Sequence, residues 1–151
     1  MMTGVDIVHI PYKGGAPALV DLLRGTAQLS FNTTGVTPAI VRAGKLTALA
    51  ACTTKRISSL PDIPTIAESG VPGYDVSSWT AVVLPAGTPK EIISKLHSEI
   101  VQVLKKPDVA KIFNGMGMEI VGNTPEEFSN IIKPEIQKWA KVIKQSGDKL
   151  D

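Results

Sequence analysis

The sequence has little of several residue types on which particular classes of function depend. Cys52 is the one cysteine among 151 residues, so no disulfide can form within the chain, and cysteine content identifies no compartment. Aromatic residues make up 5%, too few for a surface that stacks nucleic-acid bases. The 16 Lys and Arg are balanced by 14 Asp and Glu, and no basic block is longer than a pair such as Lys105-Lys106. These features argue against a nucleic-acid partner.

Patterns for membrane insertion or export are also missing. No apolar run approaches the roughly 20 residues that a transmembrane helix needs. The chain as given opens without a basic start or an apolar stretch, so we expect no secretory signal peptide in it. What is present, 43% hydrophobic and 20% charged residues, is typical of a folded globular domain with a core.

The first half alternates strand and helix patterns. Both faces of residues 5–12 are apolar, as expected for a parallel strand that is covered on both sides. Each predicted helix has a proline near its start and a glycine at its end. The predicted strands are 5–12, 27–31 and 46–52, and the predicted helices are 17–24 and 37–43. This order predicts an α/β unit with a parallel sheet.

A proline-rich segment separates this unit from the rest. Residues 55–73 are expected to form a loop with one short helix at 65–69. A further strand is predicted at 76–84, and a lobe boundary near 82–87. The carboxylates Asp62, Glu68 and Asp75 have no partner at an informative spacing in this stretch.

The remainder is predicted to be rich in helices. Thr88-Pro89-Lys90-Glu91 and Thr124-Pro125-Glu126-Glu127 both have the capping-box pattern with proline at the first helical position. Another helix is expected from Pro107, and a short strand at 119–121. Pro134 is expected to kink or split the last helix, because proline removes a backbone donor.

The loop Lys13-Gly14-Gly15-Ala16 is the most informative candidate for a binding site. It joins a predicted strand to a predicted helix, whose first turn has unpaired N–H groups and partial positive charge. Two glycines would let a carboxylate or phosphate approach this backbone closely. Two roles stay open for Tyr12: presenting its hydroxyl to the same cleft, or packing against the loop. An ordinary strand-to-helix turn remains the alternative.

A second candidate follows the next predicted strand. Asn32 and Thr33 could hydrogen-bond a ligand through an amide and a hydroxyl. Helix capping explains the same residue types without any ligand.

Catalysis finds little support in the residues. His97 is expected to be solvated on a helix, and Cys52 reads as a buried small hydrophobic residue. A thiol enzyme that uses Cys52 with His9 is an alternative that no local pattern favours. We find no metal-ligand cluster and no cofactor motif, and so expect no enzymatic activity, no metal and no cofactor.

An ordered set of short motifs resembles one family, the Bug-type substrate-binding proteins of tripartite tricarboxylate transporters. The match runs through almost the whole chain, and the set is more specific than any member alone. The motifs are 9–18, 21–25, 44–46 with 49–50, Arg56 with 60–65, 67–70 with 72–73, Trp79, 85–89 and 124–128.

The resemblance implies a type II periplasmic-binding-protein fold, with residues 1–83 as most of the second, ligand-binding lobe. Residues 84–151 would be the helical segment that packs on the first lobe. The chain resembles only the C-terminal half of the family. The implied function is a non-catalytic receptor that delivers small di- or tricarboxylates to the membrane components of the transporter in the periplasm.

The resemblance also implies the binding residues. The family's Tyr-Lys-Gly-x-Ala-Pro loop matches at Tyr12, Lys13, Gly14, Ala16 and Pro17, with Gly15 at the variable place. The turn at Asn32 and Thr33 matches less well, because the family often has an acidic residue where this chain has Asn32. That difference would alter ligand choice.

The predicted helices after Thr88 carry apolar faces with no sheet in this chain to cover them. We therefore expect a homo-oligomer, either a dimer or an exchange of C-terminal helices between chains. Two further alternatives stay open: a truncated remnant that binds nothing and survives as a self-associated fold, and a cytoplasmic effector-sensing domain.

Overall fold

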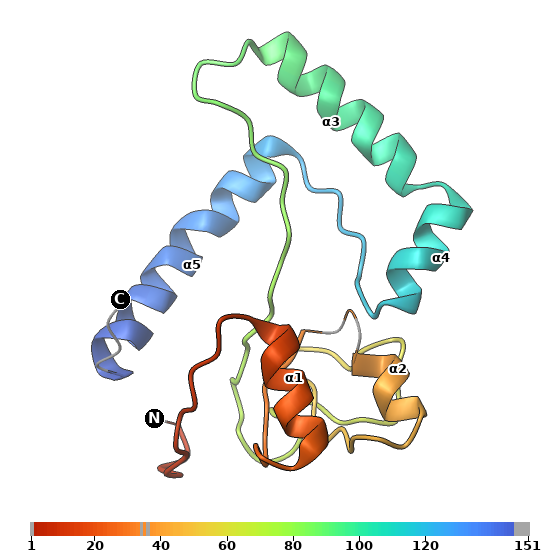
Figure 1. The fold of residues 1–151 in the computed structure, drawn as a ribbon. Coiled ribbons are helices and arrows are strands. Elements are labelled where there is room, and N and C mark those ends of the chain that lie inside the picture. Colours follow the sequence, from red (N-terminus) through yellow and green to blue (C-terminus); the bar gives the residue numbers. More distant parts are fainter. Residues whose placement is uncertain (1, 34, 36, 147–151) are drawn as a thin grey trace. The chain divides into compact units, whose positions relative to one another are not determined.

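The structure is a computed structural model that describes residues 2–33, 35 and 37–146. Its secondary structure is helical (Figure 1). The chain divides into two compact units, each described by itself: one comprises Asp6–Ala81 with Lys111–Glu119, and the other Val82–Ala110 with the segments at both chain ends. The helices are α1 (Gly15–Arg24), α2 (Thr37–Arg42), α3 (Lys90–Leu104), α4 (Pro107–Gly115) and α5 (Pro125–Ser146).

The first unit contains α1 and α2, which match the two helices predicted there. α1 ends at Gly25, whose φ of 79° lies in the left-handed region that glycine adopts without steric cost. The N–H of Gly25 donates to Leu22 O at 3.1 Å, and the N–H of Thr26 donates to Asp21 O at 2.9 Å. These bonds satisfy carbonyls that the end of a helix would leave without partners. The prediction that this helix ends at a glycine is confirmed.

The predicted sheet is wrong for the part of the chain that the structure describes. No described residue belongs to a β-strand, including the segments 5–12, 27–31, 46–52, 76–84 and 119–121. The one strand-like contact there is an isolated parallel bridge between Ala51 and Thr65. Apolar alternation marks a segment that suits a sheet, but a strand exists only where a neighbour completes its ladder of hydrogen bonds. These segments do not complete one another's ladders.

The second unit contains α3 and α5, and the same capping motif behaves differently in each. At α5 the capping box forms: the N–H of Thr124 donates to Glu127 Oε2 at 2.8 Å, and the N–H of Glu127 donates to Thr124 Oγ1 at 3.2 Å. At α3 the Thr88 hydroxyl instead donates to Pro85 O at 2.8 Å, and no side chain caps the helix. The prediction is confirmed for α5 and wrong for α3, because the turn before α3 offers Thr88 a competing acceptor.

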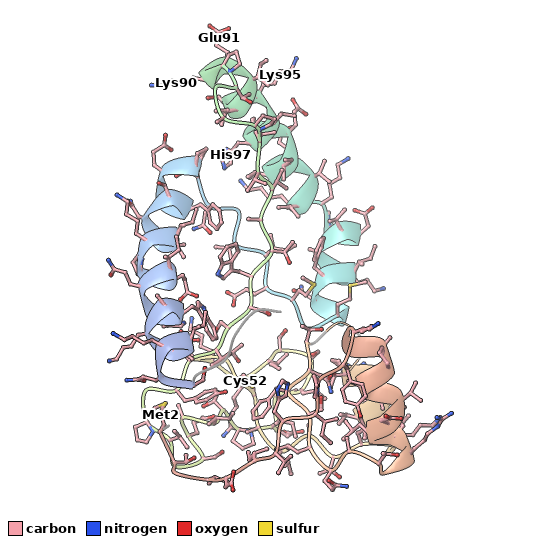
Figure 2. The ribbon with its side chains drawn as sticks, turned by 60° about the vertical axis from the view of Figure 1, so that its left-hand side comes forward. Met2, Cys52, Lys90, Glu91, Lys95 and His97 are labelled. Atoms are coloured by element: carbon pink, nitrogen blue, oxygen red, sulfur yellow. The ribbon has the colours of Figure 1, made fainter. Side chains whose placement is uncertain are left out.

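Two other predictions for this unit also need correction. α5 runs through Pro134 as one helix of 22 residues, so the proline does not split it. His97 is half-buried instead of solvated, and its Nε2 lies 3.1 Å from Asn123 O, which is in position to accept a hydrogen bond. Figure 2 shows Lys90, Glu91 and Lys95 projecting from the beginning of α3, with His97 further along the helix.

Few described side chains are buried. Ala51 and Thr65 are 4% and 2% exposed, and Ala27 and Pro38 are the other buried residues that the structure describes. Large hydrophobic side chains lie exposed in both units, among them Val8 and Phe31 in one. The helices form, but their apolar faces are largely uncovered.

Candidate functional site

The segment 13–16, which we call the loop 13–16, lies at the start of α1, and the helix begins at Gly15, two residues before the predicted start at Pro17. Gly14 caps the helix with φ 136° and ψ 171°, a backbone conformation that is essentially restricted to glycine, and no side chain caps the helix there. The N–H groups of Gly15 and Ala16 open the first turn, where a helix offers them no internal acceptor. Pro17, the third helical residue, has no N–H to satisfy. The loop thus presents backbone donors beside the positive end of the helix dipole.

The loop is open to a ligand. A Cβ added to Gly14 or to Gly15 would meet no other atom within 4 Å. Lys13 is exposed, and it forms no ion pair with any residue that the structure describes. A cation at this point adds to the attraction that the helix start has for an anion.

Tyr12 is tied to the helix that follows the loop. Its hydroxyl donates to Asp21 Oδ2 at 2.9 Å, across the residues of the loop and the first turns of α1. This hydrogen bond to the Asp21 carboxylate raises the pKa of Tyr12, and burial adds to the rise. The hydroxyl hydrogen is therefore directed to Asp21, and the bond ties the residue before the loop 13–16 to the second turn of α1.

Asn32 and Thr33 lie before α2, with the neighbouring Thr34 outside the described residues. The Thr37 hydroxyl donates to Thr33 O at 2.8 Å, which fixes the Thr33 backbone against the beginning of the helix. In Figure 1, the start of α1 and the start of α2 lie at the same end of their unit. That placement is compatible with one ligand facing both.

A group of hydrogen bonds and one ion pair in this unit was not predicted from the sequence. We call Ala51, Arg56, Thr65 and Glu68 the Thr65 cluster. The N–H of Thr65 donates to Glu68 Oε2 at 2.6 Å, the N–H of Glu68 donates to Thr65 Oγ1 at 3.1 Å, and Arg56 Nε lies 3.1 Å from Glu68 Oε2. The pKa of Glu68 is lowered mainly by the hydrogen bond from the Thr65 N–H. Burial acts in the opposite direction, and Arg56 lowers the pKa further.

The Thr65 cluster also organises the chain around it. The N–H of Ala51 donates to Pro64 O at 2.8 Å, and the N–H of Ile66 donates to Ala51 O at 2.9 Å. The predicted short helix at 65–69 is a hydrogen-bonded turn instead. Sequence reasoning left Glu68 without a partner, although Thr65-x-x-Glu68 has the spacing of a capping box and would have identified its closest one.

Cys52 lies beside this cluster and lacks the features of a nucleophile. Burial raises the pKa of the Cys52 thiol, whereas the hydrogen bond with Tyr74 lowers it by a smaller effect. Burial is also the main cause that raises the pKa of Tyr74. A reactive cysteine needs a lowered pKa from a nearby cation or base, so the environment of Cys52 is that of a packed residue.

The described residues contain no group of three or more His, Cys, Asp or Glu that could hold a metal ion. Over the same part of the chain, no helix is both long enough and apolar enough to cross a membrane.

Comparison with known proteins shows which class of protein this chain resembles. The chain is 38% identical to R. palustris Rpa4515, solved with adipate, over 97% of this chain and 49% of that one, with a TM-score of 0.86. It is 36% identical to the periplasmic binding protein BugD, over 95% of this chain and 49% of that one, with a TM-score of 0.79. MatC from Rhodopseudomonas palustris, solved with malate, is 29% identical over 92% of this chain and 48% of that one, with a TM-score of 0.74. The class is that of solute-binding receptors.

The family follows from the sequence match. Residues 1–148 match the model of the tripartite tricarboxylate transporter family receptor, TctC, and the chain belongs to that family. BugT of Bordetella pertussis is 38% identical over 150 residues, which are 99% of this chain and 46% of BugT. The chain thus spans less than half the length of that curated relative. The relatives are transport receptors and not enzymes, so the thiol-enzyme alternative is set aside.

Proposed function

We propose that this chain forms the second, ligand-binding lobe and the C-terminal helices of a periplasmic receptor for small dicarboxylates or tricarboxylates. The receptor would deliver its ligand to the membrane components of a tripartite tricarboxylate transporter. The observation that carries the proposal is the match to Rpa4515, because sequence and backbone agree over 97% of this chain with a protein solved with adipate. MatC, solved with malate, extends the same support to a shorter dicarboxylate.

The loop 13–16 is the part of the chain that we assign to the ligand. A carboxylate would accept hydrogen bonds from the N–H groups of Gly15 and Ala16, beside the positive end of α1 and the Lys13 ammonium group. Gly14 supports this geometry, since its φ of 136° turns the chain into the helix without a side chain in the way.

Tyr12 acts on this site through Asp21. Because its hydroxyl donates to Asp21 at 2.9 Å, Tyr12 fixes the loop and offers a ligand at most its oxygen lone pairs. Asp21 would serve a second purpose, since it occupies the Tyr12 donor and leaves the backbone N–H groups as the principal donors for an anion. Both residues are therefore positioning residues in the proposed site.

Asn32 and Thr33 would contribute to ligand choice. A neutral amide at position 32 can donate to a carboxylate, whereas an acidic side chain would repel it. We propose that this difference widens the range of anionic ligands that the receptor accepts.

A thermal-shift titration of the 151-residue chain tests the proposal. Adipate, malate and citrate should raise the melting temperature progressively as their concentration increases, because a ligand that binds only the folded state stabilises it. Hexanediol at matched concentration is the neutral control. Gly15→Val should remove the shift, since the new side chain fills the approach to the loop, and it should leave the unliganded melting temperature nearly unchanged because no atom lies within 4 Å.

A folded chain with no shift for any carboxylate would contradict binding by this lobe alone. It would favour the alternative of a non-binding remnant. A shift that persists in Gly15→Val would place the ligand elsewhere and overturn the assignment of the loop.

A further inference from the structure

The segment that leads into α5 contacts α3 at two positions. His97 Nε2 lies 3.1 Å from Asn123 O, and Figure 2 labels His97 on α3. A Cβ added to Gly122 would lie 3.7 Å from Val101 Cγ2, which is van der Waals contact. His97 and Val101 are about one turn apart on the same face of α3, and both are half-buried. All four residues belong to the second unit, and we call this pair of contacts the His97 clamp.

One peptide group joins the His97 clamp to the capping box of α5. Its C=O belongs to Asn123 and faces His97, while its N–H belongs to Thr124 and donates to Glu127 Oε2 at 2.8 Å. Because a peptide group is planar, a hydrogen bond at one end restricts the orientation of the other end. Each bond also polarises the group in the sense that strengthens the other bond. This peptide group therefore connects α3 to the first turn of α5.

Burial contributes little to holding these two helices in place within their unit. Neither α3 nor α5 contains a buried residue in the part of the chain that the structure describes. A region with few buried apolar contacts opens locally at a small cost in free energy. The position at which α5 begins therefore depends on contacts such as the His97 clamp.

The contact also determines which nitrogen of the His97 ring carries the hydrogen. A carbonyl oxygen can only accept a hydrogen bond, so the neutral ring must have its hydrogen on Nε2 and none on Nδ1. His9 is the other histidine of the chain; it is exposed and belongs to the first unit. The chain thus contains its own reference for a histidine outside the clamp.

From the shared peptide group and the close approach at Gly122, we propose that the His97 clamp is a conformational device that fixes the entry of the chain into α5 and holds the start of α5 to α3. His97 acts as a positioning residue, because it orients the Asn123 carbonyl and, through the same peptide group, the Thr124 N–H. In the proposed receptor, both helices belong to the segment that packs on the first lobe. The clamp would arrange them for that packing, and this consequence alone rests on the proposed function.

Nitrogen NMR of the two histidine rings in the 151-residue chain tests the hydrogen bond directly. At about pH 9, where a free imidazole is uncharged, His97 should show the Nε2–H form alone. His9 should show a mixture of both forms, since the exposed ring exchanges its hydrogen between the two nitrogens through water. A His97 ring with the same mixture as His9 would overturn the proposal.

Hydrogen exchange of the Thr124 amide tests the connection to α5. His97→Phe retains a ring of similar shape without a donor, and should make this amide exchange about threefold to tenfold faster, because one hydrogen bond to its peptide group is lost. His97→Gln places an N–H donor near the same point and should restore slow exchange. His9→Phe is the matched control and should leave the Thr124 amide unchanged.

Two results of the exchange experiment would contradict the clamp. Exchange in His97→Phe as slow as in the wild type would show that the contact does not hold the peptide group. Equally fast exchange in His97→Gln and His97→Phe would show that ring packing, and not the donor, matters. Neither measurement uses a carboxylate, so a failure here is distinguishable from a failure of the proposed receptor function. The NMR measurement on the wild type stands even if His97→Phe does not fold.

Discussion

The Thr65 cluster and α5 contain the same capping motif but differ in what surrounds it. Thr65 and Glu68 exchange bonds of 2.6 and 3.1 Å, and Thr124 and Glu127 exchange bonds of 2.8 and 3.2 Å. Thr65 is 2% exposed, whereas α5 has no buried residue. A segment expected to be mostly loop is therefore the better packed of the two. The local motif fixes the backbone in both places, and burial depends on the rest of the chain.

The two threonines should differ in how much each contributes to stability. Thr65→Ala should lower the free energy of unfolding by about 2 kcal/mol, because it removes a cap and leaves the Glu68 N–H without its acceptor in a packed site. Thr124→Ala should cost about 0.5–1 kcal/mol at the exposed cap. Urea unfolding followed by circular dichroism measures both. Thr65→Ser and Thr124→Ser retain the hydroxyl as controls, and equal losses at the two sites would contradict the role of burial.

Substitutions at two adjacent glycines of the proposed site should differ in their effect on the stability of the chain. Gly14→Ala should destabilise the chain by about 1–3 kcal/mol, because its positive φ with extended ψ is essentially restricted to glycine. Gly15→Ala should change stability little, since α1 already includes this residue and the added Cβ has open space. Thermal unfolding without ligand compares them. A Gly14→Ala protein as stable as the wild type would show that the loop relaxes freely.

The Tyr12–Asp21 bond gives a smaller effect that is specific to the ligand. Tyr12→Phe and Asp21→Asn should both weaken carboxylate binding, by about threefold to tenfold, because each loosens the loop without removing a backbone donor. Titration calorimetry with adipate measures the change. If Tyr12 donated directly to the ligand, Tyr12→Phe would weaken binding and Asp21→Asn would not.

The Thr65 cluster should also respond to acid. The pKa of Glu68 in the folded chain is lowered from its ordinary value of 4.5, so its stabilising contribution is present above pH 4.5 and is lost as pH falls through the folded pKa. Glu68→Gln should flatten this part of the stability profile. Glu126→Gln, on exposed α5, is the matched control and should leave the profile as it is. The effect should be small because solvent screens the Arg56–Glu68 pair.

The smallest expected effect concerns Cys52. Because burial raises the pKa of its thiol, alkylation by iodoacetamide at pH 8 should be slower in the folded chain than in urea. Equal rates would show that the thiol is not protected as the structure indicates.

Much of the local structure could be predicted from the residues. Proline and glycine positions predicted α1 and α2, and apolar spacing with the Thr124 capping box predicted α5, because helices close their hydrogen bonds within one segment. The loop at Lys13 was predicted to precede a helix, and it does. The family resemblance, carried by an ordered set of motifs, was confirmed by the match over residues 1–148.

Features that depend on distant partners could not be predicted in this way. The segments at 5–12 and 46–52 have apolar faces suited to a sheet, but they form no strand here because ladder hydrogen bonds require a neighbour in register. The partners of Tyr12 and His97, and the contact of Arg56 with Glu68, likewise emerged only in three dimensions. The sequence by itself determined which segments form the helices α1, α2 and α5 and to which family the chain belongs. Tertiary structure alone decided which faces are covered and where each polar group finds its partner, because burial and long-range hydrogen bonds join residues that sequence spacing does not relate.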